Sequence, residues 1–151
     1  MLHAMKNLLL LICVFAFVAQ DKKKTIMENR ARELHRVIGV KDKELWKKFM
    51  RDNYSKAMLE KPVKSNIETD EKESTTSATT ESADQLEEKA KVFERLHGNF
   101  GSSKVVSIKN VKERIEMILE NESGLRGDFT LTFEDQSPFL INRIAVEINE
   151  R

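Results

Sequence analysis

A carboxylate and a histidine three residues apart can transfer protons, and Glu94 and His97 have this spacing. On a helix the two side chains would share one face, and they would act as a general acid and base if that face bordered a pocket. The alternative is a surface pair of small energetic value, about 0.3–0.5 kcal/mol. Because surface pairs are the more frequent outcome, we predict no catalytic residue from this pattern.

The remaining metal ligands and nucleophiles are too scattered to form a site. The three histidines are His3, His35 and His97, and no two of them share a metal-ligand spacing. The single cysteine, Cys13, lies inside an apolar run after the bulky Ile12, which disfavours lipidation, and it cannot form an intramolecular disulfide. We therefore predict neither a metal ion nor a cofactor.

The unique aromatic residues are better candidates for a binding site. Trp46 is the only tryptophan and Tyr54 the only tyrosine of the chain. We predict that Trp46, Tyr54 and His97 lie at the rim of a ligand pocket. The alternative is a purely structural role, in which Trp46, Phe49 and Met50 form one helical stripe that packs against the inner face of a sheet.

Composition and charge limit the class of partner. The chain has 151 residues, a length that suits one domain. Its 26 Lys and Arg residues oppose 25 Asp and Glu residues, which gives a formal net charge of +1. A general nucleic-acid binder needs a net basic surface to contact phosphates, so a nucleic-acid partner is not expected.

Residues 1–19 have the layout of a secretory signal peptide. Lys6 precedes an apolar run from Leu8 to Ala19, and the charged segment Asp21–Lys24 follows at once. The run is shorter than the roughly 20 apolar residues that span a bilayer. We predict cleavage near Ala19, no stable membrane span afterwards, and a secreted or periplasmic location in a bacterium. The alternative is an uncleaved N-terminal anchor.

Residues 20–151 are predicted to form one domain that begins with helices. Helix formers dominate from Asp21 to Pro62, with Asp42 placed to cap a second helix. A Ser/Thr/Glu-rich tract at 65–84 has too few apolar residues to fold and is read as a flexible insertion. A further helix is predicted over Gln85–Leu96, ending at His97-Gly98.

From Ser103 onward the apolar period changes to two, which indicates strands. Four strands are predicted, with the sets Val106 and Ile108; Ile115, Met117 and Leu119; Phe129, Leu131 and Phe133; and Ile144, Val146 and Ile148 facing inward. Gly127, within an Arg-Gly-Asp triplet that we attribute to chance, is expected to permit a bulge or bend. The predicted fold class is α+β, with helices packed on one face of a curved, cone-shaped four-stranded antiparallel sheet.

Three segments carry a resemblance to a known family. They are LWKKFMRDNYSKAML (Leu45–Leu59), FERLHGNFGSSKVVSI (Phe93–Ile108) and LRGDFTLTFEDQSPFLINRIAVEI (Leu125–Ile148). They resemble the nuclear-transport-factor-2-like, or cystatin-like, accessory domain that stands before beta-lactamase-related serine hydrolase domains. The Ser-x-x-Lys motif of those hydrolases does not occur in the sequence, so the resemblance transfers no catalysis.

These observations leave three functions open. The first is an exported, non-catalytic binding or interaction module that forms a homodimer through its sheet. The second is a small enzyme or small-molecule carrier with a cone-shaped pocket. The third is a regulatory or truncated part of a serine hydrolase encoded nearby.

Overall fold

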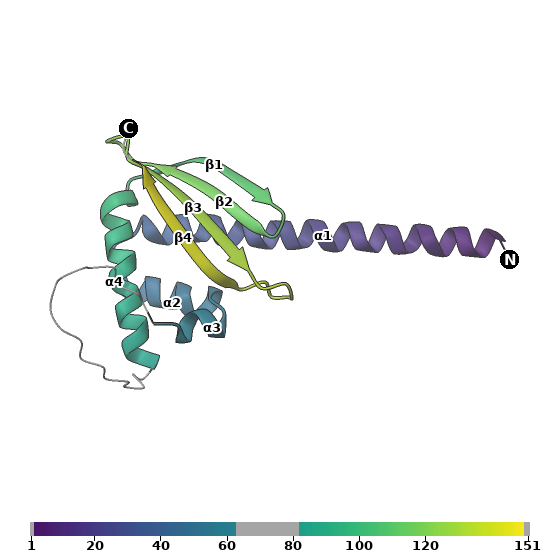
Figure 1. Cartoon of the computed structure of the whole chain (residues 1–151), viewed down its shortest axis with the longest axis horizontal. Helices are drawn as coiled ribbons and strands as arrows, with labels where there is room; N and C mark the ends of the chain where they lie inside the picture. The colour runs from purple at the N-terminus through teal and green to yellow at the C-terminus, as the bar shows by residue number, and fades with distance from the viewer. Residues whose placement is uncertain (1, 63–81, 150–151) are drawn as a thin grey trace.

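A computed structural model describes the backbone of residues 2–62 and 82–149, with side chains described from residue 20 to 62 and from 85 to 149. The elements in chain order are α1 (Leu2–Ile38), α2 (Lys43–Asn53), α3 (Lys56–Glu60), α4 (Ser82–Phe100), β1 (Lys104–Val111), β2 (Arg114–Glu120), β3 (Arg126–Phe133) and β4 (Ile141–Asn149) (Figure 1). The predicted α+β class is confirmed. The predicted insertion lies outside the described residues, except that its last residues, 82–84, begin α4.

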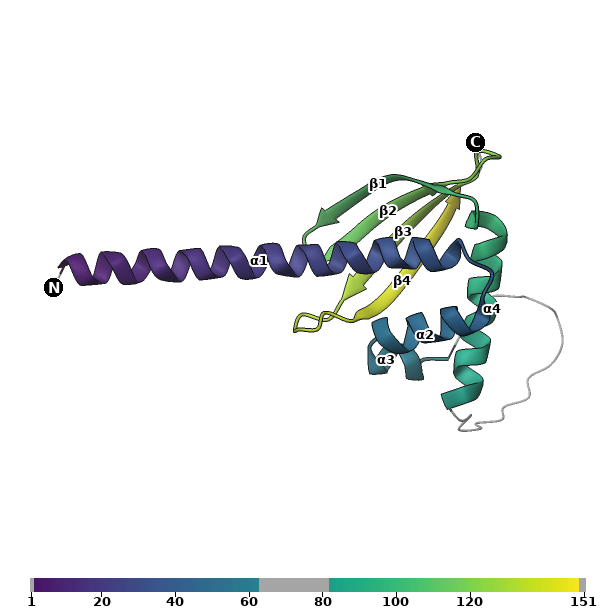
Figure 2. The same cartoon turned by 180° about the vertical axis from the view of Figure 1, so that it is seen from behind.

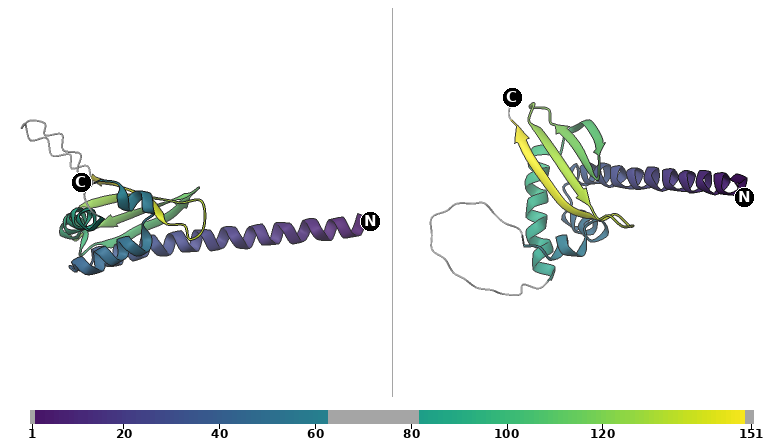
Figure 3. Two further views of the ribbon diagram at one scale, coloured as in Figure 1. Left: turned by 90° about the horizontal axis from the view of Figure 1, so that it is seen from below. Right: turned by 45° about the vertical axis from the view of Figure 1, so that its right-hand side comes forward.

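The four strands form one antiparallel meander in the order β1-β2-β3-β4, and the helices pack on one of its faces (Figures 2 and 3). The central strands β2 and β3 alternate between buried and half-buried residues, as their sequence period predicts. Their inward side chains are all buried: Ile115, Met117, Leu119, Phe129, Leu131 and Phe133. The core therefore lies between this face and the helices.

Helix α1 contributes one buried apolar face to the core. Met27, Ala31, Leu34 and Ile38 recur at helical spacing and are fully or almost fully buried. The helix has no break near Ala19, and its N-terminal part projects beyond the sheet (Figures 1 and 2). In the part of the chain whose side chains are described, no helix is long and apolar enough to cross a membrane. Cleavage of the signal peptide stays a prediction.

Helix α2 begins at the predicted cap, and its aromatic side chains pack on α4. The Asp42 carboxylate accepts hydrogen bonds from the backbone N–H groups of Glu44 and Leu45, both at 3.0 Å, and so caps the helix. The rings of Trp46 and Phe49 contact Phe93 of α4, with centroids 6.1 and 6.0 Å apart. The two rings therefore pack on α4, and they belong to the same buried core as the inner face of the sheet.

The predicted end of α4 at His97-Gly98 is also wrong. The helix continues through Gly98 for two more residues and ends at Phe100. Phe100 is completely buried, and its ring meets the ring of Phe129 edge-on, with centroids 5.5 Å apart. Burial of this ring outweighs the local tendency of Gly98 to end the helix.

Gly127 does not form a bulge, which was one of the two roles expected of it. It pairs in regular register with Leu119 on β2 and Ile148 on β4. A Cβ atom at Gly127 would lie 2.5 Å from Cζ of Phe100 and 2.8 Å from Cε2 of Phe129. Glycine is required at this position because the ring of Phe100 occupies the space above the backbone.

The edge strands depart most from the predicted alternation. A bulge between Val105 and Ser107 turns Val106 outward, so that Val105 rather than Val106 packs on the core with Ile108. On β4, Ile144 packs inward as predicted, as does Val146, whereas Ile148 at the end of the strand is 49% exposed. The inward assignment of Val106 is therefore wrong. Ile148 lies on the inner face as predicted, since it pairs with Gly127, but it is exposed at the end of the strand.

Two glycine substitutions test this account of α4 and β3. Gly127→Ala places a methyl group against two buried rings, and we expect it to lower the free energy of unfolding by about 1–3 kcal/mol. Gly98→Ala meets nothing within 4 Å on a helix, so we expect a gain of about 0.5–1 kcal/mol. Urea denaturation of the two variants measures both effects. A neutral Gly127→Ala would contradict the placement of Phe100.

Candidate functional site

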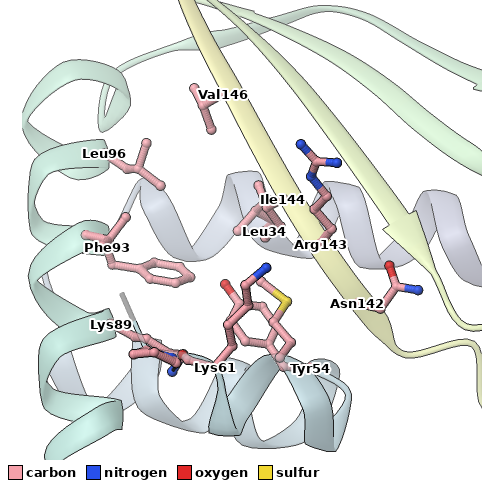
Figure 4. A pocket seen from close by; sticks show the side chains of 13 residues that line it. Leu34, Tyr54, Lys61, Lys89, Phe93, Leu96, Asn142, Arg143, Ile144 and Val146 are labelled. Atoms are coloured by element: carbon pink, nitrogen blue, oxygen red, sulfur yellow. Dashed lines mark hydrogen bonds between the residues drawn. The ribbon is translucent and has the colours of Figure 1, made fainter. Parts of the chain in front are cut away.

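The candidate site is a cavity of about 300 Å³ between α4 and the edge strand β4 (Figure 4). Leu34 of α1 lines it, and the chain around α3 closes its lower end in the view of Figure 4. The lining residues are Leu34, Tyr54, Met58, Lys61, Pro62, Lys89, Val92, Phe93, Leu96, Asn142, Arg143, Ile144 and Val146. Its volume is at the lower end of the range of small-molecule sites, about 300–1,000 Å³.

The apolar walls follow from the periodicity of three elements. On α4, Phe93 and Leu96 are three residues apart and share one helix face. On β4, Ile144 and Val146 are two residues apart and point to the same side of the sheet. Leu34 is fully buried and adds an apolar surface from α1. The cavity therefore offers an apolar interior built on regular elements.

Three cationic side chains line the same cavity, and among the described residues no carboxylate does. Lys61 follows α3, Lys89 is on α4 and Arg143 is on β4. Lys61 and Arg143 are exposed, and within the described residues neither forms an ion pair. Figure 4 shows Arg143 on the strand side of the cavity and Lys61 on the α3 side. The charge of the lining favours a ligand with an anionic group.

Lys89 also connects two helices through hydrogen bonds. Its ammonium group donates hydrogen bonds to the carbonyl oxygens of Leu59 at 2.8 Å and Lys61 at 2.7 Å. These bonds tie the end of α3 to α4 and fix one end of the cavity. Only 8% of Lys89 is exposed, and burial lowers the pKa of its ammonium group because the charged form is desolvated.

The structure separates the three residues predicted for the rim. Tyr54 lines the cavity, and its ring is held edge-on by Phe49 at a centroid distance of 5.9 Å. Trp46 and His97 do not line it; they pack against each other with centroids 6.1 Å apart. The indole N–H of Trp46 donates to the carbonyl oxygens of Val37 and Val40, both at 2.8 Å.

Glu94 and His97 do not form an acid–base pair. Nδ1 of His97 lies 2.7 Å from the carbonyl oxygen of Ile38, so the ring joins α4 to the end of α1. Glu94 is exposed and, within the described residues, forms no hydrogen bond with His97. In the same part of the chain, no three His, Cys, Asp or Glu side chains come close enough to hold a metal ion.

The cationic lining escaped the sequence analysis. Lys61, Lys89 and Arg143 stand in three segments that are far apart in the chain, and no local spacing connects them. Arg143 does lie within the LINRIAVEI stretch, where the alternation of Ile144 and Val146 indicated a strand with one face inward. Only the packing of α4 beside β4 brings the three charges to one cavity.

Comparison with known proteins gives no match: no family model, curated protein or solved structure is significantly similar to this chain. The resemblance to the nuclear-transport-factor-2-like domain, and the predicted curvature of the sheet, stay predictions.

The burial of Tyr54 predicts how stability depends on pH. Burial raises the pKa of its phenol above the ordinary value because the phenolate is desolvated. The unfolded chain loses this proton near about pH 10 while the folded chain retains it, so the free energy of unfolding falls as the pH rises above about 10. Absorbance at the phenolate band follows this single tyrosine.

The matched variant is Tyr54→Phe, which removes only the hydroxyl group. We expect its free energy of unfolding to decline less between about pH 9 and about pH 11 than that of the natural chain. A phenol that titrates in the native chain at the same pH as in urea would contradict the burial of Tyr54.

Proposed function

We propose that this chain is an exported, non-catalytic binding module whose ligand carries an apolar group and an anionic group. The observation that carries the proposal is the lining of the α4–β4 cavity, which combines apolar walls with Lys61, Lys89 and Arg143 and, in the described part of the chain, contains no carboxylate. An apolar group in the cavity would leave water, which contributes roughly 25 cal/mol per Å² of buried surface. The cations would orient the anionic end of the ligand at the mouth.

Binding rather than catalysis fits the groups that face the cavity. Its titratable lining consists of Tyr54, Lys61, Lys89 and Arg143. Burial holds the pKa of Tyr54 above its ordinary value, which makes its phenol a poor base near neutral pH. Lys89 already donates to two backbone carbonyls. This set can bind and orient an anion, and it supplies no paired acid and base.

The cavity gives a direct test with simple amphiphiles. Decanoate and decyltrimethylammonium share one alkyl chain and differ in the sign of the head group. Trp46 is the only tryptophan and stacks on Phe93, which lines the cavity, so its fluorescence reports on occupancy. We expect decanoate to shift Trp46 emission in a saturable way and the ammonium compound to bind more weakly, because the lining is cationic.

Two charge reversals serve as test and control. Arg143→Glu removes a cation from the lining, and we expect it to weaken decanoate binding about tenfold. Arg95→Glu makes the same change on an exposed face of α4 outside the cavity, and we expect unchanged affinity. Equal affinities of the two variants for decanoate would overturn the proposal.

Export is supported by the apolar run Leu8–Ala19 between Lys6 and the Lys22–Lys24 charges. Expressed in a bacterium, the chain is expected to accumulate outside the cytoplasm with its new N-terminus near Gln20. Intact mass and N-terminal sequencing measure the site. Leu11→Glu, which interrupts the apolar run, should retain the precursor inside the cell. An exported chain that keeps residues 1–19 would instead support the N-terminal anchor.

Dimerisation through the sheet stays a prediction. The exposed large apolar side chains of the described residues, Val40, Val106 and Ile148, belong to different parts of the fold and form no common patch on the open face. A serine hydrolase encoded nearby as partner also stays a prediction.

A further inference from the structure

The outer edge of β4 borders the cavity and is only partly covered. Strand β4 is the last of the sheet, so among the described residues the backbone groups that point away from β3 have no partner strand along most of its length. Tyr54 forms an isolated parallel bridge with Ile141, and the N–H of Ser55 donates to the carbonyl oxygen of Ile141 at 2.8 Å. Within the described residues this pairing covers only the start of β4. The chain itself thus shows that this edge accepts a main-chain partner.

The two edges of the sheet differ in how they resist such pairing. The β1 edge is interrupted by the bulge between Val105 and Ser107 and carries the exposed side chains of Lys104 and Lys109. Bulges and lysines are common protections of edge strands. From Arg143 to Asn149 the β4 strand keeps a regular register with β3 and contains no lysine or proline. The edge beside the cavity is the less protected one.

We propose that β4 binds an extended acidic peptide of a partner protein as a fifth strand, an inference that rests on the proposed function of the cavity. Alternate side chains of a strand point to opposite faces. Those on the helix side of the added strand would enter the cavity between Phe93 and Ile144, so they must be apolar. The remaining side chains would lie near Arg143 and Lys61, so they must be acidic.

The length and shape of the site suit this occupant. The regular part of β4 presents seven consecutive register pairs, Arg126 with Asn149 through to Thr132 with Arg143. A partner strand along it would extend about 23 Å at roughly 3.3 Å per residue. The cavity lies along the first half of this stretch, beside Asn142–Val146, where it provides room for apolar side chains. Figure 4 shows this half of β4 facing α4 across the cavity.

The test uses a blocked, fluorescein-labelled peptide of alternating valine and glutamate, eight residues long, and the full chain. Two derivatives carry N-methyl groups, one on every valine amide and one on every glutamate amide. Because alternate N–H groups of a strand point to opposite edges, only one derivative loses the donors that face β4. We expect anisotropy titrations to give affinities for the two derivatives that differ by at least about tenfold. Equal affinities, whatever their value, overturn the inference.

Two further measurements locate the peptide and separate the two proposals. The parent peptide should slow hydrogen exchange of amides between Arg143 and Asn149, and Arg143→Glu should weaken its binding while Arg95→Glu does not. Decanoate binding is measured on the same samples. A chain that binds decanoate through Arg143 but does not distinguish the methylated peptides retains the cavity function and loses the added strand. A chain that binds neither loses both.

Discussion

The contact of Phe100 with Gly127 determines how the helical layer stands on the sheet. The ring lies against the glycine backbone near the start of β3 and meets Phe129 edge-on at 5.5 Å, so the end of α4 is fixed over this end of the sheet. The side-chain amide of Asn121 strengthens this attachment by donating to the carbonyl oxygen of Asn99 at 2.8 Å. Any larger residue at position 127 would lift α4 from the sheet, and the cavity wall would move with it.

The opposite end of the cavity is fixed by polar contacts of two cations, the buried Lys89 and the half-buried Arg30. Lys89 joins α4 to the end of α3 through two carbonyl oxygens. The guanidinium group of Arg30 on α1 donates hydrogen bonds to the side-chain oxygen of Asn53 at 2.5 Å and to the carbonyl oxygen of Pro138 at 3.0 Å. These two bonds connect α2 with the loop that leads into β4. The partners of these cations are carbonyl and amide oxygens rather than carboxylates, which leaves the surroundings of the cavity positive.

Local signals predicted much of the fold. Alternation over β2 and β3 identified the buried face, and the position of Asp42 identified the start of α2. The errors arose where a distant contact outweighs a local preference. Gly98 ordinarily favours the end of a helix, but Phe100 gains more from burial two residues later. The bulge at Val106 was equally hidden, since nothing in its sequence distinguishes a bulged strand from a regular one.

The candidate site was harder to predict than the fold because it is formed by residues from distant segments of the chain. Tyr54 was identified as a unique aromatic residue, whereas the cations Lys61 and Arg143 resemble ordinary solvated side chains in the sequence. Their significance comes from the position of α4, which is fixed at both ends and stands away from β4 between them. A helix packed directly on this edge would have filled the cavity and covered the strand. The geometry that leaves room for an apolar ligand therefore also leaves backbone groups of β4 without partners among the described residues, and one constraint on α4 produces both features of the site.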